Sequence, residues 1–223
     1  MQDIETGPKL DDAAVGRIAL ALAVILSTTA CGALGDSTGK VDVAAGFYPL
    51  AWVVGRVGGD LVSVTNLTQP GAEPHDLELN VRETAAIAEA DVVVHESGFQ
   101  PAVDDGIAQN ATGTVVDAAE IAHLRPFAGQ PDQLDPHFWQ DPERLAQVAG
   151  AVADALAEAD PDHKAAYDAN AAALRAELTA LDGEYAGGLA HCERDTIVAS
   201  HDAFGYLEKY GLTVEPPFTF AVE

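Results

Sequence analysis

Basic residues are scarce in this chain. Of its 223 residues only 11 are Lys or Arg, against 36 Asp or Glu, and the formal net charge is −25 at pH 7. A nucleic-acid-binding surface needs basic residues to neutralise phosphates, and a protein held by charge on anionic lipid needs them too. The charge balance therefore argues against both classes of protein, and its simplest interpretation is solubility.

Cysteine and long apolar runs are also scarce. Two cysteines in 223 residues cannot form a disulfide scaffold. The longest apolar run covers residues 18–26, whereas a helix that spans a bilayer needs about 20 apolar residues. With 48% hydrophobic and 21% charged residues, the composition is that of a globular chain with one large domain or two small ones.

The apolar run has the length of the hydrophobic region of a signal peptide. It leads through Ser-Thr-Thr-Ala to Cys31 and Gly32, an arrangement that resembles the lipobox of bacterial lipoproteins. The resemblance implies that residues 1–31 are a lipoprotein signal peptide and that Cys31 carries the lipid. Thr28 departs from the pattern, which usually has Leu or Val there. The alternative is a buried helix followed by an ordinary cysteine. Residues 32–40 then form a flexible tether.

Short apolar segments alternate with helical patterns through the first half of the chain. Alternation of this kind predicts an α/β fold, a parallel sheet flanked by helices. Residues 122–135 are irregular in pattern. The expected strands are 41–45, 61–67, 91–95 and 114–117, and the expected helices are 49–57, 81–90 and 101–109.

Two Asp-Pro pairs open the second half. Asp141-Pro142 and Asp160-Pro161 each provide an N-cap and a first-turn proline. They predict a helix over 143–159 and a long, alanine-rich helix from 162 to about 185. A strand at 196–199, a helix at 203–210 and a further strand from 212 are expected to follow.

Three of the seven histidines occupy loop positions where a strand ends or a helix begins: His75, His137 and His201. Their wide separation along the chain excludes a zinc finger or a two-histidine helix motif. A site assembled by the fold at the carboxyl ends of the strands remains possible, and neutral imidazole suits zinc. From spacing alone, however, a loop histidine is more often a solvated or capping residue.

An aspartate stands beside each of these histidines and can hold the ring through its second nitrogen. Which of Asp76, Asp135 and Asp202 do so is left open by the sequence. The other four histidines fit a solvated or capping role better: His95, His123, His163 and His191.

Three ordered segments resemble the metal-ligand motifs of zinc-specific substrate-binding proteins of ABC transporters. They are Gly-Ala-Glu-Pro-His-Asp-Leu-Glu at 71–78, Asp-Pro-His-Phe-Trp-Gln-Asp-Pro at 135–142 and Ser-His-Asp-Ala-Phe-Gly-Tyr at 200–206. The similarity runs from about residue 41 to residue 212. It implies that His75, His137 and His201 bind Zn²⁺. Manganese-specific relatives usually carry a glutamate at the third position, so the histidine there favours zinc.

The resemblance also implies an architecture of two βα lobes joined by one long helix. Residues 41–142 are then the N-terminal metal-binding lobe, and residues 143–190 the helical region that includes the linker helix. Residues 191–223 begin an incomplete C-terminal lobe, because the sequence leaves the family pattern after Thr213. We therefore expect a C-terminally truncated member whose usual fourth, acidic ligand is missing, and whose Cys192 has lost any disulfide partner.

The function implied by the resemblance is capture, not catalysis. Zn²⁺ is bound outside the cytoplasm as a transported ligand and delivered to a membrane permease by a monomeric protein held on the membrane through its lipid. Two alternatives remain open at this point. One is an adhesin-like surface lipoprotein with an incidental metal. The other is a zinc metallohydrolase with three histidines and an open metal position, which would need a general base and a substrate pocket.

Overall fold

The computed structural model describes residues 39–215. Four parallel strands form a sheet in the order β2-β1-β3-β4, with Val43 opposite both Val64 and Val92. All four predicted strands are present, and the α/β class is confirmed. The strands are β1 (Val41–Ala45), β2 (Val62–Asn66), β3 (Val92–His95) and β4 (Thr114–Asp117).

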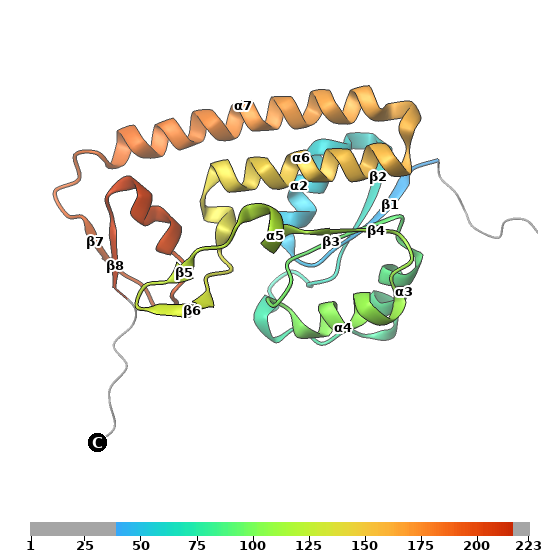
Figure 1. The fold of residues 1–223 in the computed structure, drawn as a ribbon, viewed down its shortest axis with the longest axis horizontal. Coiled ribbons are helices and arrows are strands. Elements are labelled where there is room, and N and C mark those ends of the chain that lie inside the picture. The colour runs from blue at the N-terminus through green and yellow to red at the C-terminus, as the bar shows by residue number, and fades with distance from the viewer. Residues whose placement is uncertain (1–38, 216–223) are drawn as a thin grey trace, which may run out of the picture. The chain divides into compact units, whose positions relative to one another are not determined.

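Helices cover both faces of this sheet (Figure 1). α2 and α6 pack on one face, and α3 and α4 pack on the other. Along β3 the side chains of Val92 and Val94 enter the first core while Val93 enters the second, as the two-residue period of a strand requires. The α-helices are α2 (Tyr48–Gly58), α3 (Val81–Glu89), α4 (Pro101–Asn110), α5 (Ala118–Ala122), α6 (Pro142–Ala159) and α7 (Lys164–Leu189).

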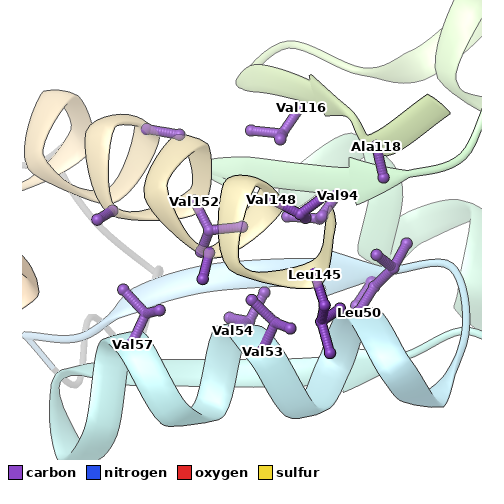
Figure 2. Packing of buried hydrophobic residues seen from close by; sticks show 14 of the residues in the cluster. Leu50, Val53, Val54, Val57, Val94, Val116, Ala118, Leu145, Val148 and Val152 are labelled. Atoms are coloured by element: carbon purple, nitrogen blue, oxygen red, sulfur yellow. The ribbon is translucent and has the colours of Figure 1, made fainter. Parts of the chain in front are cut away.

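The larger core lies between the sheet, α2 and α6. Figure 2 shows apolar side chains of α2 and α6 facing one another there, with Val94 and Val116 of the sheet beside them. Its labelled members are spaced at three or four residues along each helix, which places them on one helical face. They are Leu50, Val53, Val54 and Val57 on α2, and Leu145, Val148 and Val152 on α6.

The sequence signals for helix starts are only partly followed. Asp141 caps α6 as predicted, because its side chain accepts a hydrogen bond from the Glu143 amide and Pro142 takes the first turn. Asp160 does not cap α7 directly. A 3₁₀ turn, η4 (Pro161–His163), intervenes, and the Asp160 carboxylate accepts from the His163 ring instead. α7 therefore begins two residues later than expected, and it continues to Leu189.

α7 lies along α6 and leads to the last elements of the described chain (Figure 1). An ion pair of Arg56 with Glu177, at 2.8 Å, joins α2 to α7. Beyond α7, β7 (Thr196–Val198) and β8 (Thr213–Glu215) form a separate two-stranded parallel ladder. The proposed boundaries of the two lobes stay predictions.

Two segments differ from the sequence-based expectation. Residues 122–135 are not wholly irregular, because β5 (Pro126–Phe127) and β6 (Gln130–Leu134) pair as an antiparallel hairpin. Every residue of β6 is exposed, so no apolar alternation marks it. The helix expected at 203–210 is the shorter 3₁₀ segment η5 (Gly205–Tyr210), which ends at Gly211 in the left-handed region at φ 88°.

Within residues 39–215, no helix combines the length and apolar character needed to cross a bilayer. The expected signal peptide, Cys31 and most of the tether lie outside the described residues, as do residues 216–223.

Candidate metal centre

Three separate segments bring His75, His137 and His201 together. His75 lies in the 3₁₀ turn η2 (Pro74–Asp76), where the Glu73 side chain accepts from the His75 amide at 3.3 Å. His137 immediately precedes η3 (Phe138–Gln140), and His201 lies between β7 and η5. We refer to these three residues as the histidine triad.

The ring nitrogens of the triad are close enough to meet one ion. One nitrogen from each ring lies within 4.8 Å of the other two, and the His137 and His201 Nε2 atoms are 3.0 Å apart. The ring centroid of His75 lies 5.7 Å from that of His137 and 5.3 Å from that of His201. Ligands at about 2.0–2.1 Å from a tetrahedral zinc ion would have separations of this size. That these residues bind a metal stays a prediction.

Asp135 fixes the orientation of the buried His137 ring. Its Oδ1 atom lies 2.7 Å from His137 Nδ1 and also accepts from the His137 amide at 3.0 Å. With Nδ1–H donating to this carboxylate, the Nε2 lone pair faces the other two rings. Of the three aspartates that the sequence leaves open, Asp135 is the one that holds a triad ring within residues 39–215.

The surroundings of His75 favour the neutral, metal-binding form of its ring. Burial lowers the pKa of His75, and the neighbouring His137 and His201 lower it further, whereas Glu73 acts in the opposite direction. The aromatic ring of Phe99 packs against His75 with centroids 4.5 Å apart. His137 is buried, His75 is half-buried and His201 is exposed, so the centre is open to solvent on the His201 side.

The remaining histidines lie outside the triad. His95 is buried, with its Nδ1 atom 3.0 Å from Asp104. His163 contacts Asp160 at 2.6 Å on the surface. The exposed position of His163 agrees with the solvated role that the sequence favoured. His95 differs from that expectation, because its side chain is buried.

Glu96, which no sequence motif singled out, lines the same cavity as the triad. This cavity has a volume of about 730 Å³. Glu96 follows β3 directly and is only 2% exposed. Burial raises the pKa of its carboxyl to about 9, and the nearby carboxylates of Asp117, Asp135 and Asp104 add to the effect. The available signal was an acidic residue at the carboxyl end of a strand made of three valines and a histidine.

Tyr206 was also missed as part of the site, although it belongs to the third motif. Its side chain is buried in the main core. The hydroxyl donates to the Asp135 carbonyl at 2.7 Å and accepts from the Arg125 amide at 3.2 Å. Arg125 in turn pairs with Glu208 at 2.7 Å. These bonds hold the segment that follows His201 against the segment that orients His137.

A second group of acidic side chains lies near η5 but surrounds a cation of the protein itself. The Lys209 ammonium contacts Asp141 at 2.8 Å, Asp182 at 2.7 Å and Glu143 at 3.1 Å. Lys209 therefore offsets one of the three negative charges, and its contacts join η5 to both α6 and α7.

Comparison with known proteins gives a consistent result. The model of the family described as "Zinc-uptake complex component A periplasmic" (ZnuA) matches residues 43–221. The zinc-binding lipoprotein AdcA of Streptococcus pneumoniae serotype 4 is 32% identical over 214 residues, which cover 88% of this chain and 43% of AdcA. The chain thus spans less than half the length of this relative.

Two solved structures resemble the fold closely. The Zn(II)-bound ZnuA-like domain of S. pneumoniae AdcA superimposes with a TM-score of 0.72 at 31% identity, covering 80% of this chain and 67% of that domain. The laminin-binding protein Lmb of Streptococcus agalactiae, described as bifunctional with adhesin and metal-transporting activity, gives a TM-score of 0.69 at 29% identity. That match covers 78% of this chain and 66% of Lmb.

Proposed function

Because this chain belongs to the ZnuA family of periplasmic zinc-uptake components, we propose that it captures Zn²⁺ outside the cytoplasm and delivers it to the permease of an ABC importer. Zn²⁺ is in this proposal the transported ligand and not a catalytic cofactor. His75, His137 and His201 are the proposed metal ligands.

The convergence of the triad is the observation that carries this proposal. Three imidazoles from segments far apart in the sequence place nitrogens within 4.8 Å of one another. A set of three neutral nitrogen donors suits zinc, whereas manganese and magnesium favour oxygen donors. With three protein ligands, zinc keeps a fourth position for water or another donor. The exposed His201 leaves the ion a route in and out. The buried Asp135–His137 pair holds one ligand nitrogen in a fixed position.

Zinc titration of the purified chain tests the proposal. We expect one Zn²⁺ per chain in competition with a chelator, and a large loss of affinity in each of His75→Ala, His137→Ala and His201→Ala. His163→Ala is the matched control, because the His163 ring lies on the surface and forms a hydrogen bond with Asp160, outside the triad. A His163→Ala variant as impaired as His137→Ala, or a wild-type chain that does not bind zinc, would refute the assignment.

We propose binding without catalysis for this chain. AdcA and its ZnuA-like domain are described as zinc-binding proteins, and Lmb as an adhesin and metal transporter; neither description names an enzyme activity. The metallohydrolase alternative therefore has no support from these relatives.

We also propose that the protein is a monomer held on the membrane by a lipid on Cys31. AdcA is described as a lipoprotein, and the segment that ends at Cys31 resembles a lipobox. The residues 41–142, 143–190 and 191–223 remain our proposed division into a metal-binding lobe, a helical region and the start of a second lobe.

An adhesin role is the second candidate, and the similarity to Lmb is the observation that favours it. Binding of the purified chain to immobilised laminin, with and without Zn²⁺, distinguishes this role from transport. If cells need the gene to grow when zinc is scarce, and the purified chain does not bind laminin, the result supports transport alone.

A further inference from the structure

Glu96 occupies an energetically costly position beside the histidine triad. Its side chain is buried at the carboxyl end of β3, and neither carboxylate oxygen has a hydrogen-bond partner within residues 39–215. No basic side chain of these residues forms an ion pair with it. Burying an unpaired carboxylate is strongly unfavourable. A group retained under such a cost, next to a cluster of metal-ligand side chains, is a candidate for a functional role.

Two acidic groups around Glu96 differ from it because their carboxylates have hydrogen-bond partners. Asp117, at the end of β4, accepts from the amides of Ser97 and Ala119. Asp104, on α4, contacts the His95 ring and the Gly98 amide. Each of these two carboxylates is therefore engaged by neighbouring donors, whereas both oxygens of Glu96 are free.

Asp135 is the third acidic neighbour of Glu96. Its Oδ1 atom is engaged by His137, and its Oδ2 atom has no partner among the described residues. The Asp135 carboxylate adds to the repulsion that acts on a charged Glu96. A proton or a metal ion near Glu96 relieves this repulsion.

The geometry places Glu96 near the triad without making it a fourth ligand. Glu96 lines the cavity that His75, His137 and His201 also line. It does not belong to the set of ligand atoms that lie within 4.8 Å of one another. Any interaction of Glu96 with the ion would therefore pass through another group, and water in the open zinc position is such a group.

We propose that Glu96 is a positioning residue of the zinc site, which accepts a hydrogen bond from water in the fourth position of the bound ion. This inference rests on the proposed function. The ionised carboxylate of Glu96 would place a negative charge beside Zn²⁺ in a site whose direct ligands are neutral imidazoles. The carboxyl of Glu96 holds its proton in the zinc-free protein and loses it to solvent when the dication enters.

The test compares Glu96→Gln with Glu120→Gln by calorimetric zinc titration at pH 7.5. Glu120 is a matched control, because it lines the same cavity but is less buried than Glu96. The glutamine at 96 keeps the shape of the neutral side chain and cannot ionise. We expect about 10–100-fold weaker zinc binding, the usual effect of removing an outer-shell partner of a metal, and no change in Glu120→Gln.

Proton release provides a readout that a purely structural role would not alter. Titrations in buffers of different ionisation enthalpy give the number of protons released per Zn²⁺. We expect Glu96→Gln to release about one proton fewer than the wild type and Glu120→Gln to release the same number.

The results that would overturn the inference are distinct from failure of the proposed function. Wild-type affinity in Glu96→Gln, an unchanged proton count, or equal weakening in Glu120→Gln would each overturn the role of Glu96 while the wild type still binds zinc. A wild-type chain that binds no zinc would refute the proposed function and this inference together.

Discussion

Single residues link parts of the site that are far apart in sequence. Asp135 contacts the His137 ring through its carboxylate and the Tyr206 hydroxyl through its carbonyl. Asp135 therefore orients His137, the most buried of the three histidines. It also holds the segment that follows His201, the most exposed of them. Such outer-shell contacts set both the tautomer and the direction of a metal-binding imidazole.

Glu96 gives a prediction about the stability of the zinc-free protein. Its folded-state pKa is raised from 4.5 to about 9. Between these values the unfolded chain loses a proton that the folded chain keeps, so this residue lowers the free energy of unfolding as pH rises. Glu96→Gln removes the effect. We expect the variant to be more stable than the wild type at pH 8 by about 5 kcal/mol.

Urea unfolding of both proteins in the presence of a chelator measures this difference. The difference should shrink towards pH 4, below the unfolded pKa, where the unfolded carboxyl also binds its proton. A wild type that is as stable as Glu96→Gln at pH 8 would show that the carboxyl is not held neutral in the fold. Greater stability together with weaker zinc binding is the stability–function trade-off expected of a functional group.

Elements were predictable from the sequence where one local signal was sufficient. The strands of the sheet are short segments with apolar or alternating residues, and α6 begins at an Asp-Pro pair, so pattern alone located them. The β5–β6 hairpin could not be predicted in this way, because its exposed residues carry no alternation. η5 has a helical pattern, but its conformation depends on contacts of Tyr206 and Lys209 with residues that are distant in the sequence.

η5 gives a prediction about the element that follows His201. Tyr206→Phe keeps the buried ring but leaves the Asp135 carbonyl and the Arg125 amide without their partner. An unsatisfied buried group costs about 1–3 kcal/mol. We expect a loss of stability of that size and several-fold weaker zinc binding, because His201 is then less firmly placed.

Tyr210→Phe is the control for this variant. The Tyr210 hydroxyl bonds Asp182 on α7 at 2.6 Å, and it makes no contact with Asp135. Zinc affinity should therefore stay at the wild-type value. Thermal melting and chelator competition on the two variants decide the question, and equal zinc affinities for both would contradict a role of η5 in placing His201.

At the scale of the whole molecule, the site is a product of chain topology. The three histidines are widely separated along the chain, so spacing alone did not distinguish ligands from solvated loop residues. The resemblance of three motifs to one family singled them out. Glu96 and Tyr206 could not be assigned in advance, since their significance depends on burial and on partners that only the folded chain brings near.

The N-terminal segment gives a prediction about location. If Cys31 carries the lipid, Cys31→Ser removes the attachment, and the protein should leave the membrane fraction for the soluble extracytoplasmic fraction. Fractionation followed by immunodetection, with Cys192→Ser as the control, measures this. Membrane retention of Cys31→Ser after a carbonate wash would indicate that the apolar segment at 18–26 is an uncleaved anchor.

In the proposed site three histidines bind one Zn²⁺ at the carboxyl ends of the sheet strands. Anomalous diffraction from crystals of the zinc-loaded protein, recorded on both sides of the zinc absorption edge, locates the ion and its ligands. We predict one zinc peak at about 2.0–2.1 Å from a nitrogen of each of His75, His137 and His201. A peak held by other residues, such as His95 or the acidic side chains around Lys209, with none at the triad, would contradict the proposed site.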